Sequence, residues 1–257
     1  MSTTFMQHSW ILSPHPNPEA QRHLFCFPYT GGSASLFRPW VAAGLLSPGI
    51  EVHAIELPGR GTRQNEPPIT EFTELTDPLS DALLPFAKKD IVLFGHSLGG
   101  LMAFEVARQL QRRHNIIPLC LFASGCRAPH LPDTGPQLTD VASLITYIRS
   151  LGGQPNEQMI ARRWPLFAAD IALRTSYRYA EDVPLPCPIV ACGGKQDTSV
   201  SENDLAAWRV HTLKECSVHM FPGNHFFLHS SLQQLLEVVK HYTTTSQTPF
   251  EGDSIYV

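Results

Sequence analysis

Short runs of β-branched, aromatic and other apolar residues alternate along the chain with longer stretches in which apolar residues recur every three or four positions. The short runs are typical of buried strands and the longer ones of amphipathic helices, so their order predicts parallel strands joined by helices. Every connection fits a right-handed crossover. We expect strands at residues 23–27, 52–57, 91–94, 119–123, 189–192 and 217–221. We expect helices at about residues 36–46, 71–86, 98–113, 204–211 and 232–242.

A long segment interrupts this alternation. About sixty residues separate the fourth predicted strand from the fifth, which is too many for an ordinary loop. Apolar positions with helical spacing occur within it at residues 140–149 and again at about 157–177. An insertion over the C-terminal edge of a parallel sheet lies where open α/β folds bind ligands. We therefore predict one domain over residues 1–242, a helical lid at about 128–185 and a mobile polar tail at 243–257.

Composition agrees with one globular domain and argues against nucleic acid and membranes as partners. The 257 residues are 43% hydrophobic and 16% charged, and the net charge of -4 supplies no basic field for nucleic acid. No basic region followed by an apolar stretch opens the chain, and no segment approaches the roughly 18 apolar residues of a membrane span. We expect a cytoplasmic monomer that binds neither nucleic acid nor membrane. The six cysteines contain no C-x-x-C pair, which predicts free buried thiols.

The strongest chemical signal is Gly95-His96-Ser97-Leu98-Gly99, which joins a predicted strand to a predicted helix. A bare G-x-S-x-G is a weak motif, but a strand before it and a helix after it are the setting of a nucleophile elbow. The glycines allow a sharp turn that lifts the Ser97 hydroxyl to the sheet edge. The helix N-terminus then faces the negative charge that develops there. The pattern predicts a serine hydrolase with the α/β-hydrolase fold, a mostly parallel central sheet flanked by helices.

A serine hydroxyl needs a general base held by a carboxylate, and in this fold the chain order is serine, acid, histidine. Asp197 follows the fifth predicted strand and His225 follows the sixth. Both lie just past the carboxyl end of a strand, where the catalytic loops of such sheets collect. We predict Asp197 as the acid and His225 as the base. Asp133 and Asp182 remain alternative acids, and Asp133 is the stronger because some α/β-hydrolases carry the acid after an earlier strand.

Two backbone N–H groups are expected to form the oxyanion hole. One is that of Leu98, directly after the nucleophile, and the other lies in the glycine-rich loop after the first predicted strand. We assign the second donor to Tyr29, with Thr30 as the neighbouring alternative.

The other histidines could bind a metal or act as a second base. His96 adjoins the serine and is expected to line the site. His225 and His229 have the i, i+4 spacing of a helical zinc site, but no H-E-x-x-H glutamate lies between them. We therefore predict no metal and no other cofactor.

Several segments together resemble the type II thioesterases, the stand-alone editing hydrolases that accompany nonribosomal peptide synthetases and polyketide synthases. The resemblance spans roughly residues 20–240, and the combination is far more specific than the pentapeptide alone. The segments are Phe27-Pro-Tyr-Thr-Gly-Gly-Ser-Ala-Ser35, Leu57-Pro-Gly-Arg60, Phe94-Gly-His-Ser-Leu-Gly-Gly100, Ser124-Gly-Cys-Arg-Ala-Pro-His130, Leu151-Gly-Gly-Gln-Pro155, Gly193-Gly-Lys-Gln-Asp197 and Phe221-Pro-Gly-Asn-His-Phe-Phe-Leu228.

The resemblance implies a triad of Ser97, Asp197 and His225, in agreement with the spacing. It also implies a substrate that composition cannot show: an acyl or aminoacyl group held as a thioester on the phosphopantetheine arm of a carrier protein. Hydrolysis would release misprimed or stalled units during antibiotic or siderophore biosynthesis. The chain departs from the family in having Gly61 after Leu-Pro-Gly-Arg, where Glu is common, and Asn224 before the histidine. The change at position 61 leaves Arg60 without that neighbour, so a solvated loop arginine is at least as good an interpretation as a binding residue.

The predicted lid carries aromatic and basic side chains whose roles stay open. The aromatic residues could wall an acyl pocket, but their helical spacing favours the core of the lid itself. The arginines could dock an acidic carrier protein. The aromatic residues are Trp164, Phe167, Tyr177 and Tyr179, and the arginines are Arg162, Arg163, Arg174 and Arg178.

Two other functions compete with carrier-protein editing. A hydrolase of free small esters or lipids would share the triad without a carrier-protein partner. A binding protein that has kept the fold would lack activity, although a complete set of Ser97, Asp197 and His225 argues against it.

Overall fold

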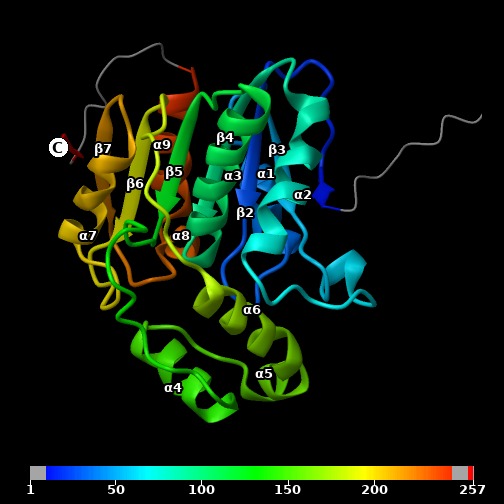
Figure 1. Cartoon of the computed structure of the whole chain (residues 1–257), viewed down its shortest axis with the longest axis vertical. Helices are drawn as coiled ribbons and strands as arrows, with labels where there is room; N and C mark the ends of the chain where they lie inside the picture. Colours follow the sequence, from blue (N-terminus) through cyan, green and yellow to red (C-terminus); the bar gives the residue numbers. More distant parts are fainter. Residues whose placement is uncertain (1–9, 245–253, 257) are drawn as a thin grey trace, which may run out of the picture.

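A central sheet organises the computed structural model, which describes residues 10–244 and 254–256 (Figure 1). Within these residues the sheet has eight strands in the order β1-β3-β2-β4-β5-β6-β7-β8. Strands β2 to β7 are parallel, whereas β1 and β8 pair antiparallel with β3 and β7 at the two edges. The strands are β1 (Ile11–Leu12), β2 (Arg22–Phe27), β3 (Ile50–Ile55), β4 (Asp90–His96), β5 (Cys120–Ser124), β6 (Ile189–Gly194), β7 (Cys216–Phe221) and β8 (Ser254–Tyr256).

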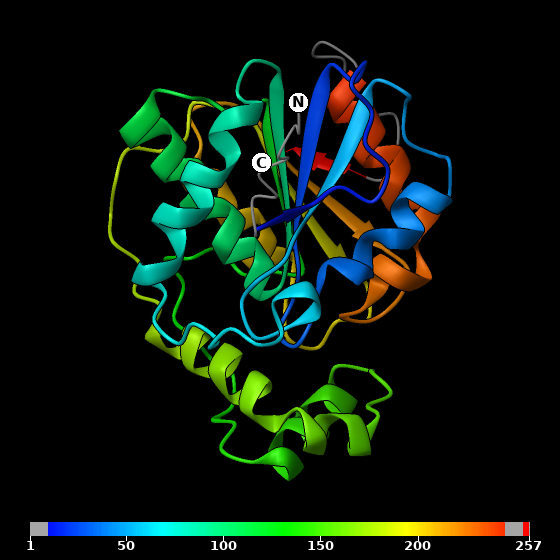
Figure 2. The same cartoon turned by 90° about the vertical axis from the view of Figure 1, so that its right-hand side faces the viewer.

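Helices cover both faces of the sheet, which Figure 2 shows edge-on. Helices α2, α3 and α7 pack on one face, and α1, α8 and α9 pack on the other. None of the helices in the described part of the chain is long and apolar enough to cross a membrane. The helices on the two faces are α1 (Arg38–Ala42), α2 (Thr73–Leu83), α3 (Leu98–His114), α7 (Glu202–Ala206), α8 (Phe227–Ser230) and α9 (Leu232–Thr244). Short 3₁₀ helices occupy Ala34–Phe37, Gly61–Arg63, Leu84–Phe86 and Ala207–His211.

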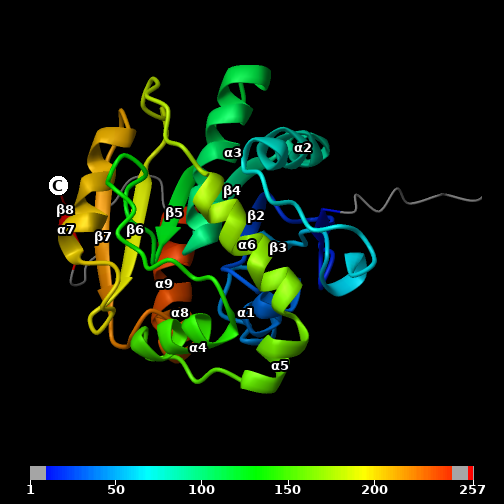
Figure 3. The ribbon, with the colours of Figure 1, turned by 60° about the horizontal axis from the view of Figure 1, so that its bottom comes forward.

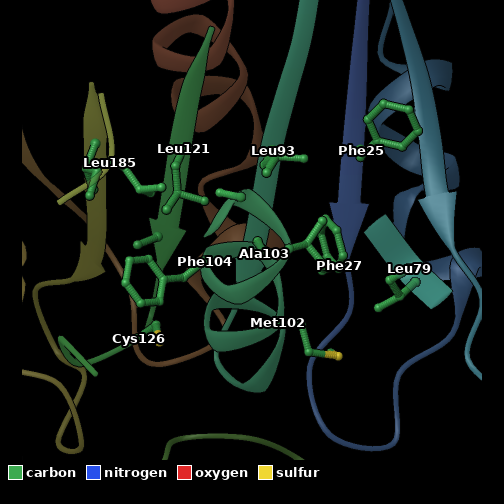
Figure 4. Packing of buried hydrophobic residues seen from close by; sticks show 14 of the residues in the cluster. Phe25, Phe27, Leu79, Leu93, Met102, Ala103, Phe104, Leu121, Cys126 and Leu185 are labelled. Atoms are coloured by element: carbon green, nitrogen blue, oxygen red, sulfur yellow. The ribbon is translucent and has the colours of Figure 1, made fainter. Parts of the chain in front are cut away.

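The parallel strands are apolar on both faces because both faces are covered. On the α3 side, Leu93 and Leu121 of the sheet belong to the same buried cluster as Met102 and Phe104 of the helix, as Figure 4 shows. This packing fixes α3, and with it the turn from which α3 starts. The mostly parallel sheet with helices on both faces confirms the predicted α/β-hydrolase fold class.

The six predicted strands correspond to β2 through β7, with ends that differ by at most a few residues. The edge strand β1 escaped prediction because its two residues carry no alternation. The predicted helix at 36–46 is a 3₁₀ turn followed by α1, which ends at Ala42, shortly before Gly44 with its positive φ of 62°. The six cysteines are free and buried, as predicted.

Three helices lie between β5 and β6 and form a layer beyond the C-terminal edge of the sheet (Figures 1 and 2), and Figure 3 shows them in front of that edge. The stretch predicted as one helix at 157–177 is two helices, because the chain turns at Arg163 and Pro165 opens the next helix. Asp140 caps the first helix and forms a capping box with Ser143. These lid helices are α4 (Val141–Ser150), α5 (Glu157–Arg162) and α6 (Trp164–Ser176).

The predicted mobile tail at 243–257 differs from the structure in two places. Residues 243 and 244 are the last residues of α9, where Thr243 is buried. Residues 254–256 form β8, whose backbone pairs with β7. Residues 245–253 and 257 lie outside the described part, so the prediction for them stands untested.

Candidate active site

Ser97 lies at a sharp turn between β4 and α3. Its backbone has φ 55° and ψ -119°, which a residue other than glycine rarely adopts. The flanking glycines make the turn possible: a Cβ on Gly95 would lie 2.0 Å from the Gly99 carbonyl oxygen, and one on Gly99 would lie 2.2 Å from that of Phe27. The sequence therefore folds into the strained elbow that the pentapeptide predicted, at the C-terminal edge of the sheet.

The loops after β6 and β7 bring Asp197 and His225 together. His225 Nδ1 lies 2.7 Å from Asp197 Oδ2, and the Asp197 side chain has no exposed surface. Ser199 donates to the other carboxylate oxygen through its backbone N–H, at 2.8 Å, and its hydroxyl, at 2.7 Å. Burial would raise the pKa of Asp197, but the hydrogen bonds from His225 and Ser199 and the charge of His225 lower it below its ordinary value. The carboxylate is thus held ionised beside the imidazole.

Sequence reasoning missed Ser199. Its hydroxyl also lies 3.3 Å from His225 Nδ1, so it contacts both members of the pair. The available signal was a hydroxyl residue two positions after a carboxylate at a strand end, a spacing that commonly forms a local side-chain turn.

The two alternative acids lie elsewhere. Asp133 is exposed and pairs with Arg174 of α6 at 3.0 Å. Asp182 pairs with Arg112 and lies 3.5 Å from Arg108. Neither carboxylate is hydrogen-bonded to His225 among the contacts of the described residues, whereas Asp197 is.

His96 is fully buried next to His225. It therefore does not line the site, contrary to the expectation from its position beside the serine. Its Nδ1 lies 2.9 Å from the Ser124 hydroxyl, and its ring centroid is 5.1 Å from that of His225. Burial lowers the pKa of His96 well below the ordinary value, so it remains neutral when His225 accepts a proton.

The two histidines with i, i+4 spacing are engaged separately. His229 Nε2 lies 3.1 Å from the Tyr29 hydroxyl, whereas His225 is held by Asp197. One His and Glu cluster with the closeness of metal ligands exists in the described residues, formed by His23, Glu51 and His53. It lies toward the opposite end of β2 and β3 from Ser97, and its two imidazoles hydrogen-bond each other at 2.8 Å.

The loop that carries the second expected oxyanion donor forms a tight turn over residues 29–32. The Gly32 N–H donates to the Tyr29 carbonyl at 2.8 Å, and Gly31 has a φ of 74°, as the third residue of a type II turn requires. Tyr29 and Ser97 line a common cavity. Leu98 is the first residue of α3, so its N–H has no partner within the helix.

Helix α6 of the lid rests on this turn. The Gly31 N–H donates to Asp170 at 2.7 Å, and a Cβ on Gly31 would lie 2.0 Å from the Phe167 ring. Arg60 forms two hydrogen bonds with Asp170, at 2.6 and 2.8 Å, and a third with the Gly32 carbonyl at 3.0 Å. The interpretation of Arg60 as a solvated loop residue is wrong, since its side chain is only 2% exposed.

Gly61, the departure beside Arg60, makes room for a different carboxylate. A Cβ at Gly61 would lie only 1.4 Å from the Glu56 carboxylate, and Glu56 accepts the Ala34 N–H at 2.7 Å. An acid at position 61 would therefore collide with the one that already occupies this space.

Two cavities meet at Ser97 and His225. The lid cavity, of about 870 Å³, lies between the three lid helices and the turn at 29–32. The side cavity, of about 540 Å³, lies between the loop after β5 and the loop of Asp197. Both cavities are also lined by Tyr147, Leu151 and Arg174.

The lid aromatic residues divide between different cores. Trp164 and Phe167 pack in the lid cluster, and Phe167 also lines the lid cavity. Tyr177 and Tyr179 pack instead against the main core, where the Tyr177 hydroxyl donates to Glu105 at 2.9 Å. The preference for a lid core was thus correct for two of the four residues.

Residues 22–244 match the thioesterase domain family. The chain belongs to the thioesterase family. The thioesterase PikA5 of Streptomyces venezuelae is 32% identical, over 93% of this chain and 88% of its own length. The structure of BorB, a type II thioesterase from the borrelidin biosynthetic cluster, superposes with a TM-score of 0.80 at 30% identity, covering 93% of this chain and 98% of BorB.

One relative bears a different name. Linear gramicidin dehydrogenase LgrE of Brevibacillus parabrevis is 39% identical, over 90% of this chain and 91% of its own length. The elbow serine and the buried Asp197 and His225 pair of this chain correspond to hydrolase chemistry, in agreement with the family match. The chain is a thioesterase, a hydrolase of thioesters, and the predicted resemblance to type II thioesterases is confirmed.

Proposed function

We propose that this thioesterase removes acyl or aminoacyl groups from the phosphopantetheine arm of carrier proteins in a nonribosomal peptide or polyketide synthase. BorB and LgrE bear names that refer to a borrelidin cluster and to linear gramicidin, which supports an association with such systems. The observation that carries the proposal is the meeting of two cavities at Ser97 and His225. A carrier-borne thioester has an acyl arm and a pantetheine arm that diverge from the scissile bond, so it needs two spaces.

In this proposal the reaction follows the serine hydrolase mechanism. His225 accepts the proton as Ser97 Oγ attacks the thioester carbonyl, and Asp197 holds the imidazole tautomer and stabilises its protonated form. The backbone N–H groups of Leu98 and Tyr29 bind the oxyanion. The carbon–sulfur bond breaks, and pantetheine leaves as a thiolate that takes up the proton. Water activated by His225 then hydrolyses the acyl-Ser97 ester and frees the serine.

The test compares one acyl group in three settings: on a phosphopantetheinylated carrier protein, on free pantetheine, and as the ethyl ester. We expect kcat/KM to be at least about tenfold higher on the carrier, which corresponds to about 1.4 kcal/mol of additional transition-state binding. The Ser97→Ala variant serves as the blank for all three. Equal kcat/KM on the carrier and on the free esters would favour the hydrolase of free small esters instead.

A further inference from the structure

The walls of the lid cavity are largely apolar where they are formed by the lid helices. Leu144 and Ile148 come from α4, Met159 and Ile160 from α5, and Phe167 and Ile171 from α6. A hydrocarbon chain gains free energy in such a space, at roughly 25 cal/mol for each Å² of apolar surface removed from water. The walls therefore suit an acyl chain better than the polar pantetheine arm, which carries amides and a phosphate.

The side cavity has the opposite character. Its lining includes Arg127, Arg174 and Arg178, and although Arg127 pairs with Asp204 at 2.9 Å, the three arginines keep an excess of positive charge that suits a phosphate-bearing arm. Its one carboxylate among the described lining residues, Asp133, already pairs with Arg174. The two linings thus favour the acyl group in the lid cavity and the arm in the side cavity.

The described lining of the lid cavity contains basic residues but no acidic one. Arg163 and Arg174 line it, and no Asp or Glu of the described residues does. Asp133, outside this lining, balances the charge of Arg174 at 3.0 Å, whereas Arg163 has no ion pair among the described residues. Asp170 is buried against Arg60 and Asp197 against His225, so neither carboxylate is free to meet a ligand.

A free aminoacyl group places an ammonium one carbon from the scissile carbonyl. Bringing that charge out of water is costly unless a carboxylate or several acceptors compensate, and the unpaired guanidinium of Arg163 opposes it. A chain of the same shape without the amine meets no such cost.

We infer that the lid cavity is the acyl site and that it selects acyl groups without a free α-amine, such as alkanoyl or N-acylated aminoacyl chains, over free aminoacyl groups. This inference rests on the proposed function and narrows it.

The test uses one carrier protein loaded with 4-methylpentanoyl, leucyl or N-acetyl-leucyl groups. The first two differ only in the α-amine, and the third keeps the nitrogen but removes its charge. Each kcat/KM is divided by the hydroxide-catalysed rate of the same thioester on free pantetheine, which removes differences in intrinsic reactivity. We expect the leucyl group to be at least about tenfold slower than both others. A leucyl value equal to or above that of 4-methylpentanoyl would overturn the inference.

A matched pair of variants tests the electrostatic cause. Met159 lines the lid cavity and is 39% exposed, so a polar side chain is tolerated there without unfolding. Met159→Glu adds a carboxylate to the wall, and Met159→Gln is its uncharged control. We expect the ratio of leucyl to 4-methylpentanoyl turnover to rise at least about threefold in Met159→Glu relative to Met159→Gln. An unchanged ratio would overturn the charge argument.

Failure of this inference is distinguishable from failure of the proposed function. If the enzyme gains nothing from a carrier protein, the proposed function fails, yet the same three acyl groups on free pantetheine still report the selectivity. If the carrier accelerates turnover but leucyl is accepted equally, the proposed function stands and the inference falls.

Discussion

Arg60 and Asp170 form a bidentate ion pair that joins the lid to the turn carrying the proposed oxyanion donor. The two side chains are 2% and 1% exposed. Asp170 also accepts a hydrogen bond from the Gly31 N–H, and Arg60 also donates to the Gly32 carbonyl. A buried ion pair contributes little net stability compared with apolar residues of the same shape, but it fixes geometry through its several hydrogen bonds. We expect this pair to position the turn at residues 29–32 for catalysis.

Substitutions at this pair should separate stability from positioning. Asp170→Asn leaves Arg60 buried without its counter-charge, so we expect a loss of about 3–5 kcal/mol in the free energy of unfolding. The double variant Arg60→Met with Asp170→Leu should recover much of that stability. Its kcat should nevertheless stay at least about tenfold low with KM little changed, because the turn has lost its partners. Denaturant unfolding and steady-state kinetics measure both quantities. Wild-type kcat in the stable double variant would refute the positioning role.

The nucleophile is tested by removing one oxygen. Ser97→Ala should lower kcat by at least about a thousandfold, since the covalent step is lost while the elbow backbone is retained. A fluorophosphonate probe should label the wild-type protein and not the variant. Circular dichroism provides the control for folding. Retention of even about a tenth of the activity would exclude Ser97 as the nucleophile.

The catalytic acid is tested by comparing two carboxylates. Asp197→Asn should reduce kcat by about 10⁴-fold, because an amide no longer holds His225 in the required tautomer. Asp133→Asn, on the alternative acid, is the matched control and should leave kcat within about threefold of wild type, since Asp133 contacts Arg174 instead. The reverse ranking of the two variants would identify Asp133 as the acid.

The positions of the proposed catalytic residues were predictable because each depends on short-range sequence. Ser97 directly follows β4, and Asp197 and His225 lie in the loops just after β6 and β7, and strand ends of a parallel sheet converge on one edge. The glycines around Ser97 also left a local signature of the turn. Topology therefore brings the three loops together without any knowledge of side-chain contacts.

The lid contacts were not predictable in the same way. Arg60 and Asp170 are 110 residues apart, and no periodicity relates a loop arginine to an aspartate inside a lid helix. The break between α5 and α6 was also missed, because apolar spacing continues across it while Pro165 starts a new helix. Tertiary packing decided both features.

Acid stability should depend on a buried imidazole far from the catalytic loops. Burial and the neighbouring charge of His23 lower the pKa of His53 to about 3. An unfolded histidine titrates near about 6.5, so below that pH the unfolded chain binds a proton that the folded chain excludes. We expect this group to cost up to about 1.4 kcal/mol of stability per pH unit as pH falls from about 6.5 to 3. Denaturant unfolding of the His53→Gln variant should show a shallower slope over this range, and an unchanged slope would contradict the assignment.

Docking of an acidic carrier protein should depend on Arg162, one of the four arginines of the lid. Arg174 pairs with Asp133, and the exposed Arg178 donates to backbone carbonyls, whereas Arg162 at the end of α5 is exposed and has no side-chain partner among the described residues. Arg162→Glu should therefore raise KM for an acyl carrier protein several-fold and weaken its salt dependence, because exposed charges act mainly through long-range attraction. Turnover of the corresponding free pantetheine thioester is the control and should not change. If the salt dependence of carrier-protein turnover is the same in Arg162→Glu as in wild type, carrier docking does not use this part of the lid.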